Sequence, residues 1–171
     1  DLFQDKAADW DQRPVPQQIS EGVFAAIDRH VTLGPDLTVM DFGAGTGLVT
    51  ARLAPRVGKI LAVDVSPAML EQLGQKPELA GKAEIVCQDL TRAPLGRTVD
   101  LVVSAMAMHH VQDTAALARA LADALHTLWV PDYGRELWEQ VRRTLTPAEL
   151  VQVGRTQVEW EREHAVRSAA Q

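Results

Sequence analysis

The sequence predicts an α/β domain built on a doubly wound, mostly parallel sheet. Apolar runs of strand length alternate with segments in which apolar residues recur at helical spacing. Three of these runs end in an aspartate, at Asp41, Asp64 and Asp89. The first is followed by a loop in which every second residue is glycine, residues 43–47. Because strand–helix–strand crossovers have one hand, we expect the first four strands in the spatial order 3-2-1-4.

The composition limits the class of protein. A length of 171 residues, of which 46% are apolar, suits one domain with a sizeable core. The formal net charge of −6 argues against a nucleic acid or an anionic membrane as partner. One cysteine, Cys87, excludes an internal disulfide. No apolar run approaches the roughly 20 residues of a membrane span, and the first residues lack signal-peptide character. We therefore expect a cytoplasmic protein.

Residues 1–35 are expected to form a helical arm ahead of the sheet. Pro14 and Pro16 punctuate its start, and apolar residues then repeat every four positions, which predicts an amphipathic helix that Gly34-Pro35 ends. The repeating positions are Ile19, Val23, Ile27 and Val31. Trp10 stands out in the polar stretch before them. It is either a hydrophobic anchor for the arm or part of a lid over a ligand.

The loop after the first strand is predicted to bind a ligand. Glycine lacks a Cβ, so the backbone can turn sharply and approach a ligand closely. The spacing Gly43-x-Gly45-x-Gly47 differs from the dinucleotide pattern G-x-G-x-x-G, because the third glycine comes one residue early. Asp41 would disfavour a pyrophosphate and suits a cation such as an ammonium or a sulfonium. Taken alone, the loop could also be a structural strand–helix turn.

The stretch Val39-Met40-Asp41-Phe42-Gly43-Ala44-Gly45-Thr46-Gly47 resembles the first motif of the class I S-adenosylmethionine-dependent methyltransferases, which have a Rossmann-like fold. S-adenosylmethionine carries both an ammonium and a sulfonium. The resemblance implies cofactor contacts from Asp41, Gly43, Ala44, Gly45 and Gly47. It also favours Trp10 as part of a lid over the cofactor, because many small-molecule members begin with a similar Ala-x-x-aromatic-Asp segment.

The second strand, residues 59–64, ends in Asp64. This acid lies about 20 residues beyond Gly43, the separation at which such folds place a carboxylate against ribose hydroxyls. Both oxygens of an ionised carboxylate accept hydrogen bonds, so Asp64 suits both hydroxyls. We include Val65 and Met69 in the predicted cofactor site, and Ser66 is expected to cap the next helix. The alternative is that Asp64 only caps that helix.

The third run, residues 83–90, contains the next strand. By the same resemblance, Asp89 accepts a hydrogen bond from the exocyclic amine of adenine, and Leu90 is its apolar neighbour. Three strand-end acids at matching steps are a more specific signal than any one of them. Cys87 is expected to point into the core as a small hydrophobic residue.

The fourth strand, residues 99–104, leads into a loop with two adjacent histidines and a helix capped by Asp113. The resemblance places Ser104 beside the methionyl part of the cofactor. His110 is the candidate general base or acceptor-positioning residue, because histidine titrates near pH 7. On an extended loop, only one of His109 and His110 faces the pocket comfortably. Both could instead be structural. Without a Cys or third His at ligand spacing, no metal site is predicted.

The resemblance covers residues 1 to about 128. We therefore expect an S-adenosylmethionine-binding domain over 1–130, with the arm or lid at 1–35 and a fifth strand near 128–130. An atypical helical tail follows over 131–171. It contains the capping box Thr146-Pro147-Ala148-Glu149 and apolar residues at heptad spacing. The tail is predicted to make contacts between chains, as in a homodimer.

Together these features predict a methyltransferase that transfers a methyl group to a small-molecule acceptor by in-line displacement. S-adenosylmethionine is the expected cofactor and S-adenosylhomocysteine the product. Because the donor is already activated, alignment of the reactants is the main requirement, and an obvious base is not needed. A non-catalytic S-adenosylmethionine-binding module that acts through a partner chain is the alternative. A dinucleotide oxidoreductase fits the glycine spacing less well.

Overall fold

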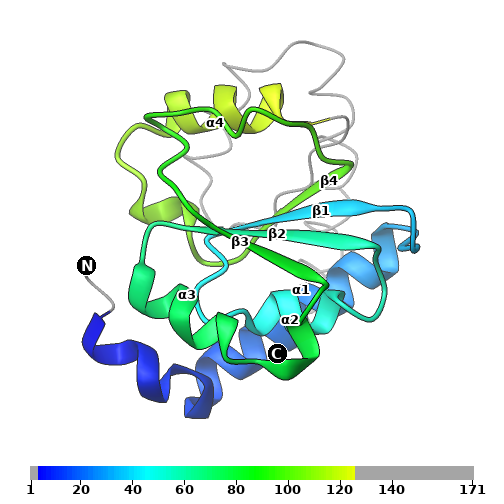
Figure 1. Cartoon of the computed structure of the whole chain (residues 1–171), viewed down its shortest axis with the longest axis vertical. Helices are drawn as coiled ribbons and strands as arrows, with labels where there is room; N and C mark the ends of the chain where they lie inside the picture. Colours follow the sequence, from blue (N-terminus) through cyan, green and yellow to red (C-terminus); the bar gives the residue numbers. More distant parts are fainter. Residues whose placement is uncertain (1–3, 126–171) are drawn as a thin grey trace, which may run out of the picture.

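Four parallel strands form the centre of the structure, a computed structural model that describes residues 4–125 (Figure 1). They are β1 (Thr38–Phe42), β2 (Lys59–Asp64), β3 (Ala83–Cys87) and β4 (Leu101–Ser104). Their spatial order is β3-β2-β1-β4, and every neighbouring pair is parallel. The predicted strand order and direction are therefore confirmed.

Helices cover both faces of this sheet (Figure 1). One face carries α1 (Pro14–His30), α2 (Leu48–Leu53) and α3 (Pro67–Gly74), and the other carries α4 (Thr114–Asp123). The 3₁₀ helices among the described residues are η1 (Gln4–Gln12), η2 (Pro77–Leu79) and η3 (Met108–His110). This is the doubly wound arrangement that the sequence predicts.

Two hydrophobic cores lie on the two faces of the sheet, because successive strand residues point to opposite sides. The core beneath α1, α2 and α3 includes Ile27, Val39, Leu53, Ile60 and Leu73. The core beneath α4 includes Met40, Leu61, Leu117 and Leu121. A fully buried aliphatic side chain contributes roughly 1.5–3 kcal/mol to folding. The alternation along β1 and β2 therefore anchors helices on both faces and holds the strand ends rigidly.

The amphipathic helix of the arm starts and ends earlier than the sequence indicates. Pro14 is the first residue of α1 and Pro16 also lies in its first turn, where a missing N–H leaves no hydrogen bond unmade. The helix stops at His30, four residues before Gly34. Val31 is extended, and its N–H still donates to the carbonyl of Ile27. Both prolines therefore lie within this helix, in its first turn.

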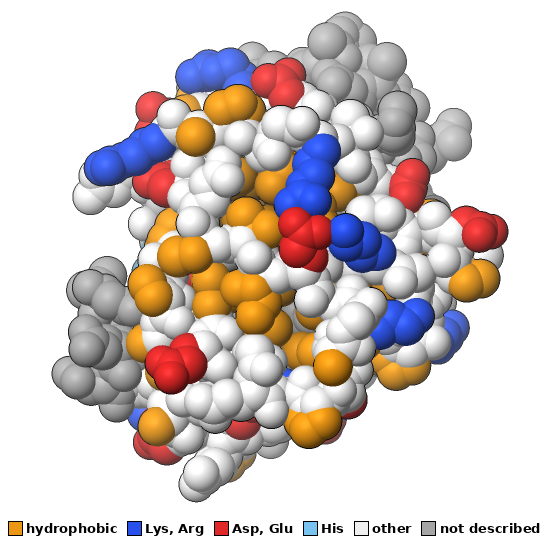
Figure 2. All heavy atoms as spheres, in the orientation of Figure 1, with side chains coloured by type: hydrophobic (Ala, Val, Ile, Leu, Met, Phe, Trp, Pro, Cys, Tyr) orange, Lys and Arg blue, Asp and Glu red, His pale blue; other side chains and the backbone are white. Residues whose placement is uncertain are grey.

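Cys87 does not point into the core, and this expectation is wrong. The residue is exposed on β3, which is an edge strand of the described sheet. Ile85 on the same strand is 43% exposed. Figure 2 shows the molecule from the side on which β3 lies in front, with hydrophobic side chains between acidic and basic ones. Beside them, the Glu84 carboxylate pairs with Lys59 and Arg97.

The predicted helix caps are present. The Ser66 hydroxyl accepts from the N–H of Met69, and the Asp113 carboxylate accepts from the N–H of Ala116. After α4 the chain returns to the sheet, where Leu125 forms an isolated parallel bridge with Val99. The predicted fifth strand at 128–130 and the tail at 131–171 lie outside the described residues. Within the described part, no helix is both long and apolar enough to traverse a bilayer.

Two glycine substitutions should shift stability in opposite directions. Gly22 is exposed in the interior of α1, and a Cβ there would contact no described atom within 4 Å. Gly22→Ala should raise the free energy of unfolding by roughly 0.5–1 kcal/mol, because alanine loses less backbone entropy on folding. A Cβ at Gly43 would lie 2.0 Å from the Cβ of Ala107. Gly43→Ala should destabilise by at least about 1–3 kcal/mol.

Urea unfolding followed by circular dichroism measures both effects. Gly22→Ala serves as the matched control, because it makes the same chemical change away from any close contact. A Gly43→Ala variant as stable as the wild type would contradict the described packing of the glycine loop against the loop after β4.

Candidate functional site

A pocket of about 910 Å³ opens at the carboxyl ends of the strands. Its walls come from the arm and the start of α1, the glycine loop, the turn after β2 and the segments after β3 and β4. The lining residues are 10, 13–16, 19–20, 41–46, 48–49, 64–65, 69, 88–92, 105–107 and 109–113. Ligand pockets usually measure roughly 300–1,000 Å³, so this one has room for a large small molecule.

The three glycines of the loop serve two different purposes. All have positive φ, 73° at Gly43, 55° at Gly45 and 84° at Gly47. A Cβ at Gly43 would collide with Ala107, and one at Gly47 would lie 2.7 Å from Cγ of Leu73. A Cβ at Gly45 would meet no atom of the described residues within 4 Å, and Gly45 lines the pocket. Packing thus requires the outer glycines, while the middle one leaves space for a ligand.

Hydrogen bonds fix the glycine loop on the end of β2. The N–H groups of Gly43 and Ala44 donate to the carbonyl of Val63 at 2.8 and 3.1 Å. The N–H of Gly45 donates to Oδ2 of Asp64 at 2.8 Å. The loop and the Asp64 side chain are therefore positioned together, and neither can move without the other.

Asp64 presents a carboxylate that is already oriented. Its second oxygen, Oδ1, accepts from the N–H of Ser66 at 2.8 Å. A carboxylate offers about four acceptor positions, so each oxygen can still accept another hydrogen bond. Asp64 is half-buried and lines the pocket beside Val65. The arrangement suits a ligand with two neighbouring hydroxyl groups.

Asp41 is a buried carboxyl at the floor of the same pocket. Only 1% of its surface is exposed, and its Oδ2 accepts from the hydroxyl of Thr50 at 2.6 Å. Burial raises the pKa of Asp41 from 3.8 to about 6, the nearby negative charge of Asp64 adds to the rise, and the Thr50 hydrogen bond opposes it. A cation in the pocket would favour the ionised form of this side chain.

Asp89 and Leu90 lie in the segment after β3. Oδ1 of Asp89 accepts from both the N–H and the hydroxyl of Thr91, at 2.9 and 2.6 Å. The Thr91 hydroxyl is the main cause that lowers the pKa of Asp89, and the neighbouring Arg92 lowers it further. Leu90 is buried at the edge of the pocket. Asp89 therefore stays ionised and is held in place by its own turn.

The two histidines do not lie on an extended loop, so the premise that they face opposite sides is wrong. They form part of η3, and their rings lie 3.9 Å apart between centroids at 43°. Both line the pocket. The pKa of His110 falls below 6.5, chiefly because its ring is partly buried and also because His109 is adjacent. Neutral His110 is therefore the main form at pH 7.

Met106, in the same loop, has an unusual backbone conformation. Among the described residues, Met106 is the one non-glycine residue with a positive φ, 57°. Its surface is 44% exposed. Such conformations are strained, and they concentrate at functional sites. Met106 lines the pocket, and so does Val15 at the start of α1, which is 63% exposed. These two residues give the pocket an apolar side.

Comparison with known proteins assigns this arrangement to a family. A family profile described as a methyltransferase domain matches residues 39–128, more than half of the chain. The chain belongs to this family. The match contains β2, β3 and β4, all of β1 except Thr38, the glycine loop and the two histidines.

Individual relatives share parts of this methyltransferase domain. The magnesium-protoporphyrin O-methyltransferase of Rhodobacter capsulatus is 36% identical over 117 residues, which are 66% of this chain and 44% of that enzyme. A probable ribosomal RNA small subunit methyltransferase A of Methanosarcina mazei is 37% identical over 71 residues, 42% of this chain and 26% of that protein. The chain thus spans less than half the length of these curated relatives.

A solved structure agrees with both fold and family. Magnesium protoporphyrin IX methyltransferase from Synechocystis PCC 6803, in complex with S-adenosylhomocysteine, superposes with a TM-score of 0.57 and 25% identity. The superposition covers 67% of this chain and 54% of that enzyme. The similarity supports a Rossmann-like methyltransferase fold for the described domain.

The structure brings most of the predicted site residues into one pocket. The predicted residues that line it are Trp10, Asp41, Gly43, Ala44, Gly45, Asp64, Val65, Met69, Asp89, Leu90 and His110. Gly47 does not line it, because it packs on α3. Ser104 does not line it either: its side chain is buried, and its hydroxyl has no hydrogen-bond partner among the described residues.

Sequence reasoning missed several pocket residues. Val15 stands between two prolines, and a lone apolar residue there carries no periodic signal. Arg13 and Gln88 also line the pocket without belonging to a motif. In the described part of the chain, no three or more His, Cys, Asp or Glu side chains are grouped as metal ligands.

Asp41→Asn should remove a pH dependence of folding. The pKa of Asp41 is about 6 in the folded chain and ordinarily 3.8, so its contribution to stability is complete below pH 4 and is lost as pH rises through 6. On going from pH 4 to pH 7.5, the free energy of unfolding of the wild type should fall by roughly 2–2.5 kcal/mol relative to that of the variant. Urea titrations at both pH values measure it.

Asp89→Asn is the matched control. The pKa of Asp89 is lowered from 3.8, so its stabilisation is present above that value and is lost only at lower pH. No comparable change is expected between pH 4 and 7.5. An Asp41→Asn variant whose stability relative to the wild type is the same at both pH values would contradict the raised pKa.

Proposed function

We propose that the chain is an S-adenosylmethionine-dependent methyltransferase that acts on a small-molecule acceptor. The observation that carries the proposal is the hydrogen bond that holds the glycine loop and the Asp64 side chain together. The Asp64 carboxylate is oriented by the N–H groups of Gly45 and Ser66, beside the open face of Gly45. This is a hydroxyl-binding group next to a backbone that a ligand can approach closely.

The remaining lining residues fit the parts of this cofactor. Asp64 would accept hydrogen bonds from the two ribose hydroxyls, Asp89 from the adenine amine, and Leu90 would pack on the base. Asp41 would favour the cationic methionyl part through its negative charge. Gly43 and Ala44 would form the wall beside it. Apolar cover would come from Trp10, Val65 and Met69, all of which line the pocket.

The chemistry requires little of the protein beyond alignment. When bound, S-adenosylmethionine supplies a methyl group on a sulfonium, an activated donor that leaves S-adenosylhomocysteine as product. Orientation of the reacting groups is worth up to about 7–11 kcal/mol in well-aligned systems. Val15 and Met106 would hold an acceptor on the apolar side of the pocket. His110, neutral at pH 7, would accept the proton that the acceptor loses.

A small molecule fits this chain better than an RNA substrate does. The net charge is −6, and an RNA-binding surface needs clustered cations to bind phosphates. Arg13 and Arg92 at the pocket pair with Asp9 and Asp89. The stretch shared with the archaeal ribosomal RNA relative is only 71 residues long, so it does not specify the acceptor.

The domain division and the setting of the protein complete the proposal. Residues 1–130 would be the cofactor-binding unit, with residues 1–35 as arm and lid, and residues 131–171 would be a helical tail that joins two chains in a homodimer. We also propose that the protein acts in the cytoplasm. Sedimentation at micromolar concentration tests the dimer, and a monomer would count against it.

A non-catalytic S-adenosylmethionine-binding module remains the second candidate. It shares every cofactor contact proposed above and differs in turnover. Incubation with S-adenosylmethionine and a panel of hydroxyl, amine, thiol and carboxylate acceptors, with S-adenosylhomocysteine formation as readout, separates the two. Cofactor binding without turnover on any acceptor would favour the module.

Asp64→Asn should weaken S-adenosylhomocysteine binding at least tenfold. Hydrogen bonds to a charged group are worth roughly 1.5–3 kcal/mol, and the amide keeps the shape of the side chain while losing the charge. Isothermal titration calorimetry gives the dissociation constant. Asp64→Asn also leaves one of the N–H groups of Gly45 and Ser66 without an acceptor, because an amide has only one oxygen, whereas Asp64→Ala releases both.

Asp100→Asn is the matched control for Asp64→Asn. The Asp100 carboxylate also accepts from a backbone N–H, that of Thr38 at 2.8 Å, but at the opposite end of β1. It should leave S-adenosylhomocysteine affinity unchanged. An Asp64→Asn variant that binds as tightly as the wild type would refute the role of Asp64.

His110→Ala should lower the turnover number without changing cofactor affinity. In the wild type, the rate constant should fall as His110 becomes protonated, at a pH below 6.5 because the pKa of His110 is lowered. The variant should lack this decline. His109→Ala is the control. Full turnover of His110→Ala with the best acceptor would assign the histidine a structural role.

A further inference from the structure

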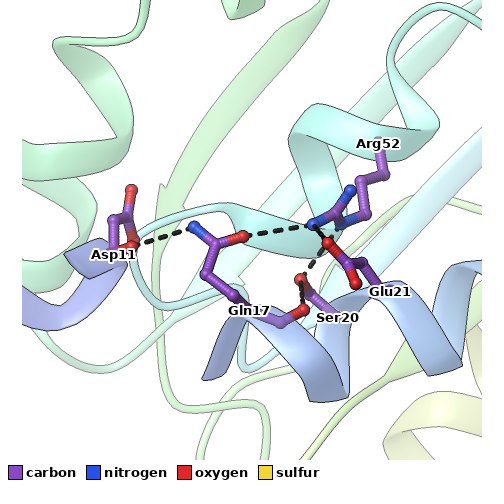
Figure 3. Close-up of polar contacts among 5 residues, drawn as sticks. All are labelled: Asp11, Gln17, Ser20, Glu21 and Arg52. Atoms are coloured by element: carbon purple, nitrogen blue, oxygen red, sulfur yellow. Dashed lines mark hydrogen bonds and ion pairs between the residues drawn. The ribbon is translucent and has the colours of Figure 1, made fainter. Parts of the chain in front are cut away.

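A chain of polar contacts joins the outer part of the arm, residues 4–13, to α2 (Figure 3). It runs from Asp11 in η1 through Gln17 on α1 to Arg52 on α2. Gln17 and Arg52 do not line the pocket. Asp11 contacts the glycine loop directly, through a hydrogen bond from Thr46.

Asp11 is the point at which the arm meets the glycine loop. Its Oδ1 accepts from the hydroxyl of Thr46 at 2.5 Å, and its Oδ2 pairs with the ammonium of Lys76 at 2.6 Å. Thr46 lies between Gly45 and Gly47 and is almost completely buried. Trp10, which lines the pocket, precedes Asp11 directly. The position of Asp11 therefore sets where the arm stands over the loop.

Gln17 holds the backbone of the arm at this point. Its Nε2 donates to the carbonyl oxygen of Asp11 at 2.9 Å, and its Oε1 accepts from Nη2 of Arg52 at 3.1 Å. An amide can satisfy both neighbours in one orientation only, because its oxygen accepts and its nitrogen donates. The cation of Arg52 thus forces the Gln17 N–H₂ group toward the arm (Figure 3).

Arg52 is itself fixed by two further contacts. Its Nε donates to the hydroxyl of Ser20 at 3.0 Å, and its Nη2 also pairs with Glu21 at 3.2 Å. The Ser20 hydroxyl in turn donates to the carbonyl of Gln17 at 2.8 Å and is buried. A guanidinium presents several donors in a rigid plane, so these contacts define its orientation.

We propose that Gln17, oriented by Arg52, is a positioning residue that latches the arm against the glycine loop and thereby slows release of the cofactor. The effect on cofactor release rests on the proposed function. The contacts of Gln17 with Asp11 and Arg52 are present in the protein without a bound cofactor. Because Gln17 touches neither loop nor pocket, its effect is transmitted through the Asp11 backbone.

A second pair of residues provides a control. Arg56 follows α2 and pairs with Asp28 near the end of α1 at 2.5 Å. It joins the same two segments as Arg52, with similar chemistry, but far along α1 from the arm. Arg56→Ala therefore removes a contact between α1 and the end of α2 without disturbing Asp11.

The test compares Gln17→Glu, Arg52→Lys and Arg56→Ala with the wild type. Gln17→Glu keeps a partner for Arg52 but replaces the donor to Asp11 by an acceptor, so stability should hold while the arm opens. Hydrogen exchange of peptides covering residues 4–13 reports arm opening without ligand. Stopped-flow displacement of S-adenosylhomocysteine reports its dissociation rate. Thermal unfolding checks that each variant is folded.

Exchange in residues 4–13 should be faster in Gln17→Glu and Arg52→Lys than in the wild type and Arg56→Ala. S-adenosylhomocysteine should dissociate about fivefold faster from the first two, the factor expected when one net hydrogen bond is lost. Unchanged arm exchange in Gln17→Glu would overturn the latch whether or not the ligand binds. Faster exchange with unchanged dissociation would overturn its role in retention. A wild type that does not bind S-adenosylhomocysteine would overturn that role together with the proposed function.

Discussion

The hydrogen bond from the Gly45 N–H to the Asp64 carboxylate is the contact on which the site depends. It joins the loop after β1 to the end of β2, and the parallel pairing of these strands brings the two together. The positive φ values of the glycine loop and the close packing of Gly43 on Ala107 restrict the backbone conformation of this loop. A ligand that approaches Gly45 therefore meets an oriented carboxylate without further rearrangement.

The same geometry places two acids close to each other, which opposes folding. Asp41 is buried at the floor of the pocket, and the charge of Asp64 helps to raise its pKa to about 6. Keeping Asp41 ionised at neutral pH destabilises the chain by roughly 3 kcal/mol relative to a group with its ordinary pKa. A cationic ligand offsets this penalty. Such a trade between stability and binding is common at functional sites.

The order and direction of the strands could be predicted from the sequence. The strand-end acids Asp41, Asp64 and Asp89 and the glycine spacing are short motifs that mark where parallel strands end. The sequence did not predict features that depend on residues distant in sequence but close in space. Cys87 is exposed although the predicted order 3-2-1-4 already placed β3 at an edge of the sheet, because the residue pattern of β3 does not state which of its side chains the helices cover. The 3₁₀ turn at His109 and His110, the role of Gly47 in packing on Leu73, and the Gln17 contact with Asp11 all depend on tertiary partners.

The pocket is proposed to bind a cationic cofactor over the Asp41 carboxyl. Calorimetric titration with S-adenosylmethionine at pH 6, in two buffers of different ionisation enthalpy, counts the protons exchanged on binding. Because the pKa of Asp41 is about 6, roughly half a proton should be released as the cation makes the carboxyl ionise. Asp41→Asn should release none. Binding of S-adenosylmethionine to the wild type without proton release, or no binding at all, would contradict a cation site over Asp41.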